Sequence, residues 1–192
     1  YKSILCINRC EINFHSKYDR PKKQSFSFSS SKRMFTDAKI LRAIVDDDSD
    51  AVEFFLESKE TFNLVIDVSI VKEPPQLLEN GTPLIDIAIM LDSKKCISVL
   101  LSHQENVEIT DKNGRRPVHI CSAFGNIEAL SLLKRKGADL NAVDNNGKSC
   151  LHYAALYGKK EAIKYLLRNR LKPNVTDAAG NTPLSYACKC NE

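Results

Sequence analysis

The C-terminal half of the sequence repeats with a fixed period of 33 residues. Three copies of an Asp-x-x-Gly turn lie in register, and each leads into a short, largely apolar segment. The matching segments are Asp111–His119, Asp144–His152 and Asp177–Ser185. A period of this length predicts stacked supersecondary units, because one small unit cannot bury its own apolar face. The chain is therefore restricted to a repeat architecture.

Within each unit, two segments with helical periodicity are predicted, separated by Gly125 or Gly158. The first helices bring small and apolar residues to one face by 3–4 spacing, and Pro117 and Pro183 fit their first turns. These faces are Val118, Cys121, Ser122 and Leu151, Ala154, Ala155. The second helices are predicted over 127–136 and 160–169, with the stripes Ile127, Leu130, Leu133 and Ile163, Leu166, Leu167. The turn glycines Gly114, Gly147 and Gly180 are expected to have positive φ.

Two fainter copies lie upstream. Gly81–Leu84 leads to the apolar run Ile97–Leu101, whose phase predicts a one-residue insertion near Met90–Ser93. In this copy Leu91 stands where the mid-repeat glycine is expected. A still fainter unit covers Ile40–Ser58, so the chain holds about four and a half units, the last one truncated.

The segment between these two units has a different pattern. Asn63–Lys72 alternates β-branched residues and is followed by Pro74 and Pro75, which predicts an extended and longer connection. Asp46–Asp50 lacks the ligand spacing of a calcium loop and is interpreted as a polar turn in which Ser49 or Asp50 caps the next helix.

The repeated pattern resembles that of ankyrin-repeat proteins. The residues that carry the resemblance are Asp-x-x-Gly, a Thr/Ser-Pro-Leu-His segment with substitutions, a mid-repeat Gly, a Leu-Leu run and Gly137-Ala-Asp-Leu-Asn141, with Arg170 and Leu171 replacing Gly-Ala in the next copy. The match is strong over 111–184 and weaker over 37–110. The resemblance implies an all-α solenoid with short turn or hairpin loops over 37–192.

Residues 1–36 differ from the rest in charge. They carry eight Lys/Arg against Glu11 and Asp19, whereas the whole chain has a net charge of +4. We interpret this Ser/Phe-rich segment as a disordered tail, with nuclear import or polyanion binding through Arg20–Lys23 as the alternative. The Phe residues of this tail lie in no recognisable nucleic-acid-binding fold.

Seven cysteines in no regular framework indicate a reducing, intracellular setting, cytoplasmic or nuclear. Cys96, Cys121 and Cys188 are predicted to pack in the core. Cys6, Cys10 and His15 supply only three ligands, so no metal is expected. Without a phosphate loop, paired-His motif or nucleophile elbow, the sequence predicts no enzyme activity and no cofactor. No run of residues is long and apolar enough to span a membrane.

Two polar positions allow structural and functional interpretations. His119 and His152 recur at one repeat position, which favours a hydrogen bond that ties neighbouring units together over a catalytic or metal-binding role. Ser185 stands there in the next copy. Asn141 resembles ankyrin asparagines that a dioxygenase hydroxylates, but a turn-forming role is favoured; the sequence does not settle whether it is modified.

The resemblance implies a concave groove that binds a partner protein. Phe124, Leu156 and Tyr157 are its expected anchors, with Arg115 and Lys148 steering an acidic edge; for Phe124 and Tyr157, packing on the neighbouring unit is an equal alternative. The remaining expected contacts at the turn tips are Lys112, Asn113, Asn145 and Asn146. We expect a monomeric scaffold whose partner the sequence does not identify.

The alternatives are a regulatory ankyrin segment of a larger enzyme or channel, and polyanion binding through the basic tail. The first residue is Tyr, and Asp177 begins a unit that is only half complete. Both features lead us to expect a longer parent protein.

Overall fold

The computed structural model describes residues 39–57, 82–103 and 106–189, and what was predicted for the tail 1–36 and for 63–72 lies outside them. A helical stretch at 39–45 comes first. The labelled helices are α3 (Ser49–Glu57), α4 (Leu84–Met90), α5 (Lys94–His103), α6 (Pro117–Phe124), α7 (Ile127–Arg135), α8 (Cys150–Leu156), α9 (Lys160–Arg168) and α10 (Pro183–Lys189).

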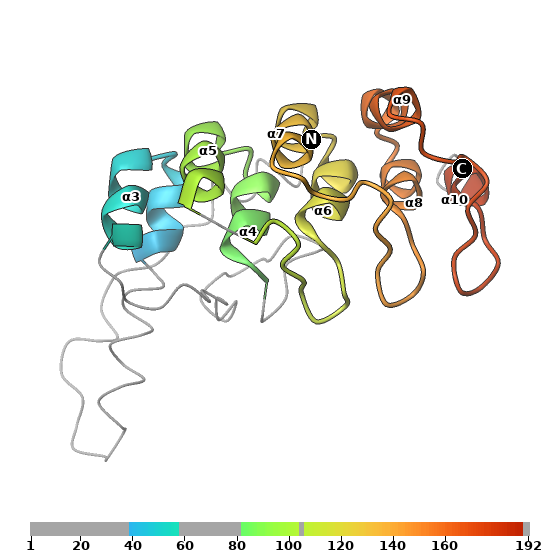
Figure 1. Cartoon of the computed structure of the whole chain (residues 1–192), viewed down its shortest axis with the longest axis horizontal. Coiled ribbons are helices and arrows are strands. Elements are labelled where there is room, and N and C mark those ends of the chain that lie inside the picture. Colours follow the sequence, from blue (N-terminus) through green and yellow to red (C-terminus); the bar gives the residue numbers. More distant parts are fainter. Residues whose placement is uncertain (1–38, 58–81, 104–105, 190–192) are drawn as a thin grey trace, which may run out of the picture.

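The helices form two rows (Figure 1). An inner row is formed by α4, α6, α8 and α10, and each of these helices packs directly on the next. α5, α7 and α9 form an outer row, each packed on the inner helix of its own unit. The turns that begin at Asp111, Asp144 and Asp177 project from the inner row, and we call them fingers. The predicted all-α repeat solenoid is thus confirmed.

One continuous apolar core runs through the described units. The side chains of Val118, Leu130, Leu133 and Leu166 are fully buried, as their spacing predicts. Burial of each such side chain contributes about 1.5–3 kcal/mol. The predicted stripe of α9 is wrong at Leu167, which is 42% exposed, because Ala162 rather than Leu167 joins the predicted Leu166 in the core.

The helix register corrects the predicted insertion in the second unit. The N–H groups of Ser93, Asn126 and Lys159 donate to carbonyls five residues back, and these three positions are spaced by 33 residues. Asp92, not Leu91, has the left-handed conformation of the mid-repeat glycine, with φ of 56° against 75° at Gly125. Since the 33-residue phase holds, no residue is inserted near Met90–Ser93; the Thr82–Leu84 triplet is instead displaced by one position.

The same turn in the first unit is built around two aspartates. Asp48 Oδ1 accepts from Ala51 N–H at 3.1 Å and so caps α3, in place of the predicted Ser49 or Asp50. Asp47 has φ of 50°, and its Oδ1 accepts from the N–H groups of Lys95 and Cys96, each at 3.1 Å. Asp47 therefore caps the outer helix of the following unit, which ties the first unit to the second.

The turn glycines meet a steric as well as a conformational requirement. Gly114, Gly147 and Gly180 all have positive φ, as predicted. A Cβ on Gly114 would lie 2.2 Å from Asn145 Oδ1, in the turn of the next unit. At Gly180 nothing lies within 4 Å of such an atom. The glycines thus permit close stacking where a following unit is present.

The C-terminal side of α10 is uncovered by any described element. Leu184 is 71% exposed, whereas Leu151, one unit earlier, is 3% exposed. Cys188 is exposed for the same reason, so its predicted core position is wrong. Cys96 and Cys121 are buried as predicted, and burial raises the pKa of both thiols.

Arg170 has a strained backbone conformation at a repeat position where the preceding unit has glycine. It occupies the position of Gly137 and has φ of 64°, a conformation that costs a residue with a Cβ on the order of 1 kcal/mol. We predict that Arg170→Gly raises the free energy of unfolding by about 0.5–1 kcal/mol in urea denaturation. Lys172→Gly, at an exposed coil position nearby, is the matched control and should not stabilise the fold. Equal or lower stability of Arg170→Gly would contradict this explanation.

Candidate functional site

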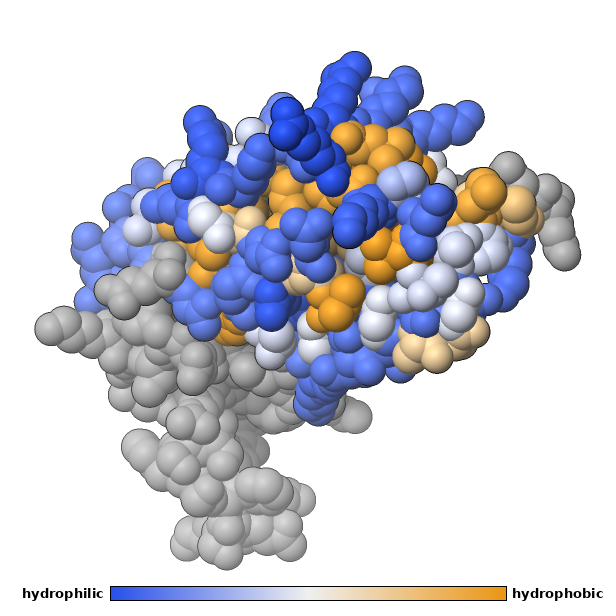
Figure 2. All heavy atoms as spheres, turned by 45° about the vertical axis from the view of Figure 1, so that its right-hand side comes forward, coloured by the Kyte–Doolittle hydropathy of each residue, from blue (hydrophilic) through white to orange (hydrophobic). Residues whose placement is uncertain are grey.

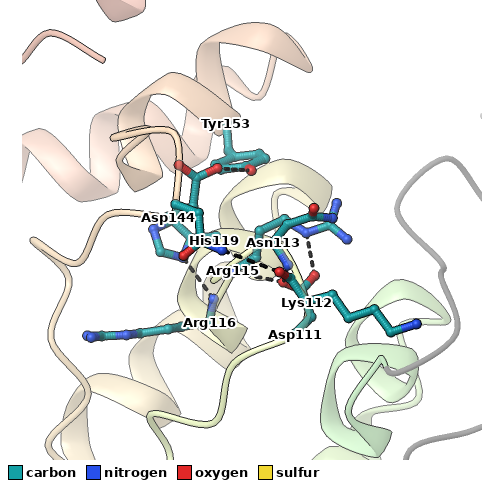
Figure 3. Close-up of polar contacts among 9 residues, drawn as sticks. Asp111, Lys112, Asn113, Arg115, Arg116, His119, Asp144 and Tyr153 are labelled. Atoms are coloured by element: carbon teal, nitrogen blue, oxygen red, sulfur yellow. Dashed lines mark hydrogen bonds and ion pairs between the residues drawn. The ribbon is translucent and has the colours of Figure 1, made fainter. Parts of the chain in front are cut away.

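An aspartate organises each of the turns that precede α6, α8 and α10, and Figure 3 shows two of them, Asp111 and Asp144. Asp144 Oδ1 accepts from the backbone N–H groups of Asn146 and Lys148 at 2.9 and 2.8 Å. The equivalent bonds link Asp111 to Asn113 and Arg115, and Asp177 to Ala179 and Asn181. Two backbone N–H groups of each short loop therefore bond to the aspartate side chain, and a third bonds to the backbone carbonyl of the same aspartate. These bonds make the finger rigid.

The second carboxylate oxygen ties the finger to the following inner helix. Tyr153 donates its hydroxyl to Asp144 Oδ2, and Tyr186 to Asp177 Oδ2, both at 2.7 Å. The Tyr186 bond, helped by backbone N–H donors, lowers the pKa of Asp177 to about 2. The same bond raises the pKa of Tyr186 to about 12.

Arg115 takes the part of the tyrosine in the third unit (Figure 3). Its Nε donates to Asp111 Oδ2, and the Arg115 side chain is buried. Arg115 therefore does not face solvent at the turn tip, and the structure gives no support to its expected role in steering a partner. Asp111 Oδ2 requires a hydrogen-bond donor, and the Asp-x-x-Gly motif alone does not show which residue supplies it.

Neighbouring units are joined through backbone contacts of the fingers and through histidines. Asn145 N–H donates to Asn113 O at 3.0 Å. His119 is fully buried; its Nδ1 accepts from Arg116 N–H, and its Nε2 lies 3.0 Å from Ala142 O in the next turn. His152 repeats this with Asn181 O at 3.0 Å. The predicted structural role of both histidines is confirmed, and Ser185 keeps only the local part of it, by bonding to Thr182.

Asp86 stands at the histidine position of the second unit. Its N–H donates to the carbonyl three residues back, as those of His119 and His152 do, and it is fully buried. Neither of its carboxylate oxygens has a hydrogen-bond partner within the structure described. Burial, followed by repulsion from Asp111, raises the pKa of Asp86 well above its ordinary value, while Arg115 opposes this shift. Among the described residues, Asp86 therefore supplies no counterpart of the hydrogen bond that His119 and His152 each make to the following unit.

We predict that Asp86→His stabilises the protein by about 1–3 kcal/mol at pH 8, since it replaces an unpaired buried polar group. A raised folded-state pKa means that folding retains a proton. The wild-type free energy of unfolding should therefore fall as pH rises above the ordinary carboxyl pKa of 3.8. Asp86→Asn, which removes the ionisable group without adding another, should lose that slope in urea denaturation between pH 4 and 8, whereas Asp50→Asn, an exposed control, should keep it. A destabilised Asp86→His protein would contradict the assignment.

A hollow of about 330 Å³ lies between the second and third units, where α4 and α6 end. Its lining combines apolar residues with polar and charged ones. The lining residues are Ile89, Met90, Asp92, Lys94, Phe124, Gly125, Asn126, Ile127 and Glu128. Lys94 Nζ pairs with Glu128 at 2.9 Å, and Asn126 Nδ2 donates to Asp92 at 3.0 Å. The polar part of the lining is thus held in place by bonds that cross from one unit to the next.

The predicted anchors lie at the ends of the inner helices of successive units, but they do not share one pocket. Phe124 lines the hollow, and it is half-buried against the core. Leu156 and Tyr157 occupy the equivalent position one unit later and are also half-buried. The other expected contacts are spread over the finger tips. Lys112, Asn145 and Asn146 are exposed, Asn113 is half-buried, and Lys148 Nζ lies 5.3 Å from the centroid of the Tyr186 ring.

The repeat pattern, the helix pairs and the coupled fingers agree with a comparison against protein families. The model for ankyrin repeats (3 copies) matches residues 40–144 and 125–192. The chain belongs to the ankyrin-repeat family. This family is in general a non-catalytic interaction module. Asn141, exposed in this ankyrin chain, has its N–H bonded to Asp139 Oδ1, as a turn-forming residue requires.

Among curated proteins, a 55-residue stretch is 36% identical to "Target of rapamycin complex 2 subunit AVO2" of Saccharomyces cerevisiae. The stretch is 29% of this ankyrin chain and covers 13% of the yeast protein. Within the residues that the structure describes, no three His, Cys, Asp or Glu side chains are grouped as a metal site. No helix there is long and apolar enough to cross a bilayer.

Proposed function

We propose that this ankyrin chain is a monomeric intracellular scaffold that binds a partner protein through the groove side of its inner helices. The observation that carries the proposal is the hollow at Phe124, which is lined both by apolar residues and by the charged residues Asp92, Lys94 and Glu128. A hollow that presents the half-buried Phe124 fits one apolar side chain of a partner. A polar rim that excludes water around such an anchor is typical of binding hot spots.

The rigidity of the surrounding structure supports this use. Phe124 ends α6, and the C-cap Gly125 fixes the direction in which the chain turns away. Bonds within the lining connect Asp92 with Asn126 and Lys94 with Glu128, so that both units hold the site in one shape. A pre-organised site loses less entropy when it binds. Leu156 and Tyr157 extend the same surface to the next unit.

The yeast relative is named as a subunit of a complex, which motivates a second candidate of the same kind. In that candidate this chain is the ankyrin segment of a larger assembly, held by the same groove. Three buried cysteines with free thiols agree with a reducing compartment.

We predict that Phe124→Ala weakens capture of the partner about tenfold or more, as expected for a hot-spot aromatic. Tyr157→Ala should weaken it less, since Tyr157 does not line the hollow. The measurement is quantitative affinity capture from cell lysate, with thermal melting of each variant. Phe54→Ala is the matched control, because Phe54 is 70% exposed on α3, away from the hollow.

Phe124 also packs on the core, so a photo-crosslinking residue at position 124 provides a second measurement that does not depend on truncation. It should crosslink to the partner whose capture Phe124→Ala reduces, and the same residue at position 54 should not. Capture that is unchanged in a folded Phe124→Ala protein, together with no crosslink at 124, would reject the hollow as the anchor site.

A further inference from the structure

The exposed charge of the helices changes from one end of the solenoid to the other. α3 exposes Asp50, Glu53 and Glu57. α9 and the coil after it are cationic, with a single acidic residue, Glu161. The exposed cations there are Lys160, Lys164, Arg168, Arg170 and Lys172, which together with Leu167 we name the cationic ridge. Figure 1 places α3 and α9 toward opposite ends of the solenoid.

Most of the ridge is one face of α9, and Arg170 and Lys172 follow in the coil after it. Lys160, Lys164 and Arg168 recur every four residues, so they lie on the same side of the helix over about 12 Å. Leu167 lies beside them at the edge of this face and is 42% exposed. The opposite side carries the fully buried Ala162 and Leu166. In Figure 2, hydrophilic side chains project along the upper edge with hydrophobic surface between them.

Folding does not account for the cations at the start of α9. Lys159 and Lys160 stand at the N-terminus of α9, where the helix dipole disfavours positive charge. Asn126, at the matching position before α7, caps its helix by accepting from Ala129 N–H at 3.0 Å, whereas Lys159 makes no side-chain cap. Lys164 pairs with Glu161 at 2.7 Å. Over the described ranges, no carboxylate lies within ion-pair distance of Lys160, Arg168 or Lys172.

We propose that the cationic ridge binds an anionic membrane surface. Lysines on flexible stems suit a sheet of mobile headgroups, and the exposed Leu167 can enter the boundary between headgroups and acyl chains. The acidic α3 would be repelled from such a surface, so the solenoid would approach it with the α9 end first. The hollow at Phe124 stays free, because none of its lining residues belongs to the ridge.

The composition of the ridge favours a membrane over the other polyanions. Single-stranded nucleic acid is held by aromatic platforms between cations, but Tyr165, the aromatic of α9, is half-buried against the core. An acidic protein would be recognised by a shaped and polar surface, yet here an exposed leucine lies beside the charges. The combination of cationic charge and exposed apolar area on the ridge matches a lipid interface.

The test is co-sedimentation of the full 192-residue chain with vesicles of phosphatidylcholine alone or containing one-third phosphatidylserine. We expect binding only to the anionic vesicles. The triple variant Lys160→Gln, Lys164→Gln, Arg168→Gln should lower the partition coefficient about tenfold or more, and Leu167→Gln should lower it several-fold. The changed side chains are exposed, and the melting temperature of each variant checks that it folds.

A tail variant with the same loss of charge, Lys22→Gln, Lys23→Gln, Lys32→Gln, is the matched control and should retain most of the binding. The proposal is overturned if the tail variant loses binding while the ridge variant keeps it, or if neutral vesicles bind equally well. It is also overturned if single-stranded RNA or polyglutamate binds more tightly than the vesicles with the same dependence on the ridge.

Discussion

The structure depends on the contact between one helix pair and the next. Neither row of helices covers its own apolar side, so the side chains of α6 and α7 are buried only because α4, α5, α8 and α9 lie against them. Polar groups then fix the spacing of this stack. His119 and His152 each join their own turn to a carbonyl of the following unit, and the Asp-centred fingers align beside one another. The 33-residue period of the sequence therefore reflects the regular spacing of these contacts between units.

This rigid scaffold presents chemically different surfaces at separate places. The hollow at Phe124 lies at the end of the inner helices, and the cationic ridge follows the outer face of α9. Asp86, which replaces the histidine that couples later units, lies on α4, and the C-terminal end of α4 contributes Ile89 and Met90 to the hollow.

The repeated part of the fold could be predicted because its signals are periodic. Helix positions, turn glycines and both histidines follow from spacing alone. The errors share one physical cause, which is that identity at a motif position does not fix geometry. Asp92 adopts a glycine conformation without being glycine, Arg115 turns inward to replace a tyrosine hydroxyl, and Leu167 faces water although its residue type suits a core. Only the three-dimensional register shows which neighbour each side chain meets.

The most direct test of the account is native-state hydrogen exchange on a Leu133→Ala variant. Leu133 is fully buried in α7, and its truncation should cost about 2–5 kcal/mol. If units are stable only through their neighbours, amides of α8 and α9 should lose protection together with those of α6 and α7. Wild-type protection in α8 and α9 beside a weakened α7 would contradict the account, because the units would then be stable independently.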